Sequence, residues 1–207
     1  MRKLVFIIAA IFLCSAVQTG PYAKWDAKEI EKANSGKNIS YLGDEEKRVI
    51  TLCNMARVNP KLFAETIVEH YIDSVSYKGS AYLNSLKKTL LTTKPMSALA
   101  VAEDMYAIAK DHAEQMGKTG KKGHENFEKR YAAAKKKYSG LGENCHYGSN
   151  KAMKIVMALL IDEGVGDSGH RKNILDPNFK YIGVALREHK SSTWNCVMSF
   201  SGPEKEK

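Results

Sequence analysis

The sequence has few long hydrophobic runs, no internal repeat and no low-complexity tract. Its one continuous apolar run, residues 4–13, is too short to span a bilayer comfortably, and no second run follows it. The absence of repeats leaves one domain as the default for a chain of this length. We therefore expect a single folded unit without an integral membrane segment.

The apolar run has the features of a secretory signal peptide. Arg2 and Lys3 precede it, and the small residues Ser15 and Ala16 follow it, so we predict a signal over residues 1–18. Its removal lowers the formal net charge from +9 to +7. The predicted location is secreted, either periplasmic or extracellular.

Cysteines are also few. Cys14 lies inside the predicted signal, which leaves Cys53, Cys145 and Cys196, an odd number for a compartment that can be oxidising. Cys53 falls at an apolar helix position, whereas the other two lie on segments that read as extended. We predict a Cys145–Cys196 disulfide and a free Cys53.

Residues 19–42 are polar and irregular, and we predict a flexible leader there, with the folded domain over residues 43–203. Apolar residues recur at helical spacing in the first two thirds of this domain and alternate near its end. One predicted helix begins at Asp44, and a second follows Asn59-Pro60. A third spans Tyr82 to Leu90, and a fourth begins at Ser97 and ends at Gly117. Two more span Phe127 to Tyr138 and Ser149 or Asn150 to Gly164. The predicted extended segments are Glu143 to Tyr147, Ile182 to Leu186 and Trp194 to Phe200, with a turn or helix at Gly169 to Leu175.

This order predicts an α+β fold, in which helices pack against a small, mostly antiparallel sheet that ends in a hairpin. Three glycine-containing motifs precede the hairpin. They are Gly123-His124-Glu125-Asn126-Phe127, Gly142-Glu143-Asn144 and Gly169-His170-Arg171. Two histidines and a carboxylate that a fold brings together make a candidate metal or anion site.

The order of these motifs resembles the CAP superfamily, the cysteine-rich secretory, antigen 5 and pathogenesis-related proteins. The resemblance covers residues 44–202 and is strongest from Leu99 onward. It is carried by Asn54 and Arg57, His124, Gly142-Glu143-Asn144, Gly169-His170, and Ile182-Gly183-Val184-Ala185. It implies a three-layer α-β-α sandwich with a cleft lined by two histidines and two acidic residues.

Carried over to this chain, the cleft residues would be His124, Glu143 and His170, with Asp162 or Glu163 as the second acid and Asn144 beside them. The two imidazoles, His124 and His170, would be the metal ligands, for zinc or calcium. The resemblance thus implies a secreted binding module whose cleft takes a divalent cation or a small ligand.

An enzyme is the alternative, namely a metal-assisted hydrolase of peptide or cell-envelope substrates with Glu143 as general base. The chain has no His-Glu-x-x-His helix to preform a protease chelate, and we favour a protein without catalysis. The histidines could instead hold loops by hydrogen bonds to backbone, which would leave a structural protein with a vestigial cleft. Cys145 and His146 do not make a nucleophile and base, because neighbouring strand residues point to opposite faces.

A basic region follows the core helix. Its members are Lys118, Lys121, Lys122, Lys129, Arg130 and Lys135 to Lys137. Such a region either attracts polyanions or is simply solvated, and it lacks the interleaved aromatic residues that favour nucleic acid. The predicted partner is an extracellular lipid, glycan or protein. Arg57 and His112 read as structural residues, Arg57 bracing neighbouring carbonyls and His112 lying in the core.

Overall fold

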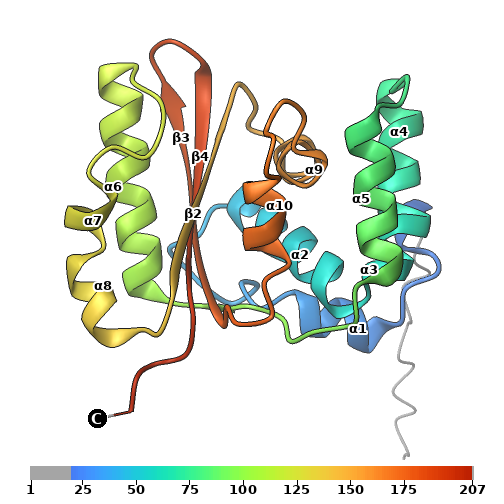
Figure 1. Cartoon of the computed structure of the whole chain (residues 1–207), viewed down its shortest axis with the longest axis horizontal. Helices are drawn as coiled ribbons and strands as arrows, with labels where there is room; N and C mark the ends of the chain where they lie inside the picture. Colours follow the sequence, from blue (N-terminus) through green and yellow to red (C-terminus); the bar gives the residue numbers. More distant parts are fainter. Residues whose placement is uncertain (1–19, 207) are drawn as a thin grey trace, which may run out of the picture.

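The computed structural model describes residues 20–206, and the predicted signal peptide lies outside this range. The chain forms three layers, with a sheet between two groups of helices (Figure 1). This arrangement confirms the predicted α+β sandwich. None of the helices between residues 20 and 206 has the length and apolarity that crossing a membrane requires.

The sheet has four strands in the order β1-β3-β4-β2. Their bounds are β1 Ala100–Val101, β2 Leu141–Tyr147, β3 Tyr181–His189 and β4 Thr193–Ser201. β1 pairs with β3 in parallel, while the β3–β4 hairpin and the β4–β2 pair are antiparallel. The mostly antiparallel sheet is therefore confirmed, and β2, which carries the Gly-Glu-Asn motif, lies at its edge.

Helices cover both faces of this sheet (Figure 1). One face carries α6 Glu103–Thr119, α7 Phe127–Arg130 and α8 Ala132–Lys137, and the other carries α2 Asp44–Val58, α9 Ala152–Ile161 and α10 Gly169–Ile174. Beyond these lie α1 Ala27–Ala33, α3 Pro60–Phe63, a π-helical turn at Ala64–Val68, α4 Glu69–Val75 and α5 Ala81–Thr92, and a short 3-10 turn spans Gly20–Tyr22.

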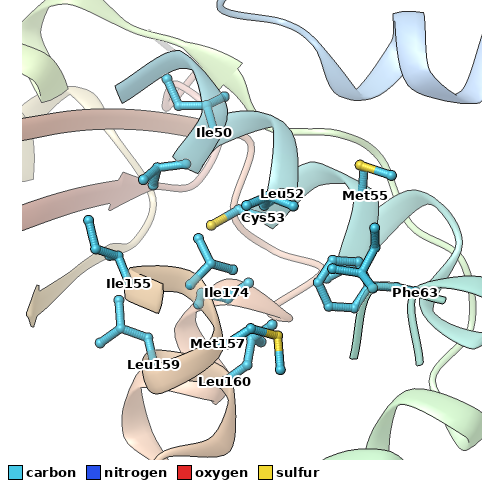
Figure 2. Close-up of a cluster of buried hydrophobic side chains, with 14 of the residues drawn as sticks. Ile50, Leu52, Cys53, Met55, Phe63, Ile155, Met157, Leu159, Leu160 and Ile174 are labelled. Atoms are coloured by element: carbon cyan, nitrogen blue, oxygen red, sulfur yellow. The ribbon is translucent and has the colours of Figure 1, made fainter. Parts of the chain in front are cut away.

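The larger core lies between the sheet and the second helical group. Figure 2 shows its centre, where side chains of α2 and α3 meet those of α9 and α10. The labelled residues are Ile50, Leu52, Cys53, Met55, Phe63, Ile155, Met157, Leu159, Leu160 and Ile174, and all of them are buried. This packing fixes the positions of α9 and of α10, and the second site histidine, His170, lies in the first turn of α10.

On the opposite face, α6 approaches β3 closely at Gly183. A Cβ atom added there would lie 2.1 Å from the backbone nitrogen of Tyr106 and 2.2 Å from the carbonyl carbon of Met105. Backbone cannot move aside as a flexible side chain can. The glycine in the Ile-Gly-Val-Ala motif is thus explained by helix packing.

We expect Gly183→Ala to lower the free energy of unfolding by about 2 kcal/mol, because α6 must shift away from the sheet. Urea unfolding followed by circular dichroism measures the change. Gly140→Ala is the matched control, since its added Cβ would meet only Phe179, at 3.8 Å. Equal stability of the two variants would contradict the close approach.

The predicted leader over residues 19–42 is wrong for residues 20–42, which are folded. Asp26 and Glu29 form a capping box at the start of α1. Trp25 is buried, and its indole nitrogen donates to Thr66 Oγ1 at 2.9 Å. The polar composition was misleading because α1 buries only Ala33 completely and shows most of its surface to solvent.

The core helix is also shifted from its predicted bounds. Ser97 does not cap it, because residues 100–101 first form β1 and the N-cap is Ala102. The helix continues through Gly117 and ends at Gly120, which adopts a left-handed conformation.

The predicted Cys145–Cys196 disulfide is wrong, because both thiols are free, as is that of Cys53. In the β2–β4 register, Cys145 pairs with Val197 and Cys196 pairs with His146. Because cross-strand partners share a face, the two cysteines point to opposite sides of the sheet. Cys145 packs in the small cluster under α6, whereas Cys196 lies in the larger core.

Candidate functional site

His124 lies in the loop that follows α6, and two hydrogen bonds of the neighbouring glycine hold this loop. Gly123 has a positive φ of 107°, a conformation that suits glycine. Its carbonyl accepts a hydrogen bond from His112 Nε2 at 2.9 Å, and its N–H donates to the Tyr147 hydroxyl at 2.7 Å. His112 is thus a buried structural residue, as predicted, and it places His124 beside β2.

The first polar cluster is centred on Glu143, whose side chain is 1% exposed. His124 Nδ1 lies 2.8 Å from Oε1. Arg130 donates to both carboxylate oxygens, at 2.5 and 2.8 Å, and the Tyr131 hydroxyl lies 3.2 Å from Oε2. The carboxylate is therefore surrounded by donors, and its negative charge is balanced by Arg130.

These donors decide the ionisation of Glu143. Burial raises the pKa of the carboxyl group, but hydrogen bonds from His124 and Arg130 and the charge of Arg130 outweigh burial and bring the pKa to about 2. A general base works best with a pKa near the operating pH. The geometry therefore disfavours Glu143 as the base of a hydrolase.

A buried group of three possible metal ligands lies in this cluster. One ligand atom each from His112, Glu143 and Cys145 lie within 4.8 Å of one another, a spacing that could hold a metal ion. The protonation and hydrogen bonds of these three side chains do not suit a metal ion. His112 uses Nε2 for the Gly123 carbonyl, burial raises the pKa of the Cys145 thiol well above its usual range, and Arg130 occupies both Glu143 oxygens. We derive no chemistry through a metal at this group.

The second polar cluster is centred on Asp162, at the end of α9. Its side chain is fully buried, and His170 Nδ1 lies 2.7 Å from Oδ1. Backbone N–H groups of His170 and Arg171 donate to Oδ2, at 3.0 and 3.2 Å. Asp162 adopts a left-handed conformation, which turns the chain toward α10. Of the two candidate acids, the structure therefore pairs Asp162 with His170.

The other candidate, Glu163, points elsewhere. It is exposed, and its carboxylate accepts a hydrogen bond from the Tyr77 hydroxyl at 2.8 Å. Asn144 bridges β2 to α10, because its side chain donates to the His170 carbonyl at 3.0 Å and accepts from Asn173 at 2.8 Å. Asn144 is thus linked to the second cluster through the backbone carbonyl of His170.

The two clusters lie on different faces of β2. Glu143 faces α6, where His112 approaches to 3.8 Å, whereas the neighbouring Asn144 faces α10. Figure 1 shows α6 and α10 on opposite sides of the sheet. Among residues 20–206, no group of three closely spaced ligand atoms contains either His124 or His170. Their shared role as metal ligands stays a prediction.

Both histidines nevertheless have the same local arrangement. Each ring presents Nδ1 to a buried carboxylate, Glu143 for His124 and Asp162 for His170. Because a carboxylate accepts, Nδ1 donates the hydrogen bond, and Nε2 is the ring nitrogen left for another partner. Within the described part of the chain, neither Nε2 atom has a hydrogen-bond partner, and the side chains of His124 and His170 are 49% and 24% exposed.

Some residues of the site were missed by sequence reasoning. Arg130 was assigned to a basic surface region, yet its side chain is 13% exposed and pairs with Glu143. The buried positions of Tyr131, Ala134 and Tyr138 give the signal, since they define the inward side of α7 and α8. Several lysines of that region pair with acids instead of lying free: Lys121 with Glu125, Lys135 with Glu128, and Lys137 with Asp104 and Glu204.

Comparison with known proteins identifies one family. The family model described as the cysteine-rich secretory protein family, CAP, matches residues 50–200. No curated protein matches the chain.

Three solved structures are similar to this chain at low sequence identity. An extracellular protein with a SCP domain from Bacillus anthracis str. Ames is 15% identical, with a TM-score of 0.47 over 76% of this chain and 41% of that one. An outer surface protein from Borrelia burgdorferi is 15% identical, with a TM-score of 0.45 over 72% and 96%. A cysteine-rich secretory protein from Staphylococcus aureus subsp. aureus Mu50 is 15% identical, with a TM-score of 0.42 over 61% and 40%. The chain thus spans less than half the length of two of them.

Proposed function

Because this chain belongs to the cysteine-rich secretory protein (CAP) family, we propose that it is an exported binding module that takes a divalent cation through His124 and His170. The observation that carries the proposal is the matched pairing of the two rings with buried carboxylates. Histidines that bind metals usually donate their other ring N–H to a carboxylate, which fixes the tautomer and the ring orientation.

The two histidines flank the same strand. β2 is the edge strand, and the proposal requires the two rings, which lie against its opposite faces, to meet a common ion at its free edge. Glu143 and Asp162 then orient the imidazoles, and the cation would contact only the Nε2 atoms. When bound, such an ion would add a positive charge and coordinate water at this surface.

The hydrolase alternative lacks a supporting observation. Its proposed base, Glu143, is held by Arg130 and has a pKa of about 2. The thiol of Cys145 lies 3.8 Å from His124 Nδ1, but burial raises the pKa of this thiol and leaves it protonated. We therefore propose binding without catalysis, with an extracellular lipid, glycan or protein as the partner.

Isothermal titration with zinc chloride tests the cation site. We expect the metal-free protein to bind one zinc ion, and the His124→Ala, His170→Ala double variant to bind none under the same conditions, because both nitrogen ligands are gone. His70→Ala is the control, since His70 is exposed on α4. Identical titrations for the wild type and the double variant would rule out the site.

A further inference from the structure

The tip of the β3–β4 hairpin lies beside the carboxyl end of α6 (Figure 1). The backbone N–H of Lys190 joins the two elements, because it donates to the Gly117 carbonyl at 3.0 Å. A Cβ atom added at Gly117 would lie 2.3 Å from the Glu188 carbonyl oxygen, so the helix and the hairpin are tightly packed there. They border a cavity of about 650 Å³, a volume typical of sites for small ligands.

This cavity contains an aromatic side chain that is not used by the fold. Trp194 lines the cavity and is half-buried, and its indole N–H has no hydrogen bond to any residue that the structure describes. The other tryptophan, Trp25, is buried and donates to Thr66. A partly exposed indole combines an apolar face with a polar N–H, and such side chains are enriched at binding surfaces.

The same cavity offers charges of both signs. Lys118 and Lys190 line it and are exposed, and neither forms an ion pair within residues 20–206. Glu188 pairs with Trp194 across the hairpin, so the two side chains share a face of the sheet. It is also exposed and has no ion pair in the described part of the chain. Two ammonium groups and one carboxylate therefore remain for a ligand.

Arg187 connects this cavity to a neighbouring one of about 250 Å³, because it lines both. Its guanidinium is held by Glu46 at 2.8 Å and by Glu114 at 3.4 Å. In the second cavity Tyr41, which is 37% exposed, packs on Tyr106 with ring centroids 4.6 Å apart. An elongated ligand would thus meet an aromatic ring in each cavity.

We propose that these two cavities bind an acidic oligosaccharide, with a sugar ring stacked on the indole of Trp194. The apolar face of the ring covers the indole, its hydroxyl groups donate to Glu188, and its carboxylates pair with Lys118 and Lys190. A polyphosphate has the negative charge but neither the ring face nor the hydroxyl donors. This inference rests on the proposed role as a binding module, and it selects the glycan among the proposed partners.

Titration of the full chain with tetragalacturonate in EDTA tests this inference. We expect the tryptophan emission to shift to the blue, because a stacked ring removes water from Trp194, whereas Trp25 is already buried. Cellotetraose lacks the carboxylates, and tripolyphosphate lacks the sugar rings. Each should bind roughly tenfold more weakly than tetragalacturonate, because it satisfies only part of the cavity.

Two variants remove separate parts of the site, and calorimetry measures their affinities. Trp194→Ala and the Lys118→Gln, Lys190→Gln double variant should each bind tetragalacturonate roughly tenfold more weakly. The lysines are exposed, so the double variant should keep the wild-type melting temperature. The Lys78→Gln, Lys88→Gln double variant is the charge-matched control, because these exposed lysines lie beside and on α5, away from the hairpin.

Glu188→Ala distinguishes sugar recognition from simple attraction between charges. Removal of a negative charge would tighten the binding of any polyanion, whereas loss of a hydroxyl acceptor weakens the binding of a sugar acid. We expect weaker binding of tetragalacturonate. Tighter binding by Glu188→Ala, unchanged binding by Trp194→Ala, equally tight binding of tripolyphosphate, or no binding of tetragalacturonate would each overturn the inference.

The result is independent of the cation site, because EDTA removes divalent ions from the titration. If tetragalacturonate binds and zinc does not, the proposed cation site fails and this inference stands. If zinc binds and tetragalacturonate does not, only this inference fails.

Discussion

Replacing Arg57 by alanine is expected to lower the free energy of unfolding by about 4 kcal/mol, the largest single effect that we predict. The Arg57 guanidinium is completely buried, and it donates to the carbonyls of Ser97, Ile174, Asp176 and Phe179, all at 2.8 to 3.0 Å. Each carbonyl that loses its donor and stays buried costs roughly 1–3 kcal/mol, and those nearer the surface regain water.

These carbonyls belong to two segments distant from α2 in sequence. Ser97 precedes β1, Ile174 is the last residue of α10, and Asp176 and Phe179 lie between α10 and β3. Arg57 thus holds the end of α10, the helix that carries His170, to α2. Its loss should therefore also loosen the second cluster.

Urea unfolding of Arg57→Ala and of Arg48→Ala measures the difference. Arg48 lies on the same helix, but its side chain is 67% exposed and it forms a surface ion pair with Glu45. An exposed pair contributes at most about 1 kcal/mol. A similar loss in both variants would show that Arg57 does not act through its buried carbonyl contacts. Arg57→Lys should restore only part of the stability, since an ammonium group cannot reach four carbonyls.

The structural role of Arg57 was predictable from sequence, because its spacing from Asn54 places both on one side of a helix that reads as buried. The terminal hairpin was equally predictable, since Trp194, Cys196, Met198 and Phe200 alternate. Both predictions depend on local periodicity, which the sequence displays directly. The folded segment at residues 20–42 was not predictable in this way, because its packing depends on the contact of Trp25 with the distant Thr66.

The sequence predicted which residues belong to the candidate site, but not how they are distributed over the two faces of β2. The alternation that separates Cys145 from His146 also separates Glu143 from Asn144, so the motif supplies one residue to each face of β2. Sequence order shows neither that β2 lies at the edge of the sheet nor that Arg130 turns inward from a run of basic residues. These facts depend on strand order and helix orientation, which are set by packing between distant segments.

Acid is expected to destabilise the protein through Glu143. The carboxyl pKa is about 2 in the folded protein and 4.5 without the fold. Since the folded-state pKa is depressed, the ionised carboxylate contributes its full stability above about pH 4.5, and this contribution is lost as the pH falls toward 2. The loss is on the order of 3 kcal/mol. Urea unfolding at a series of pH values measures it.

Glu143→Gln isolates this contribution, because an amide cannot titrate and does not balance the charge of Arg130. We expect the variant to be about 3 kcal/mol less stable than the wild type at pH 7, and the difference to shrink toward pH 2. Glu65→Gln is the control, since the exposed Glu65 lies 3.9 Å from Lys61 in a surface ion pair. A stability difference that stays constant from pH 7 to pH 2 would mean that Glu143 acts by packing alone. A difference that closes in acid would instead show that the charge of Glu143 holds Arg130 and His124 at the edge of β2, as the proposed cation site requires.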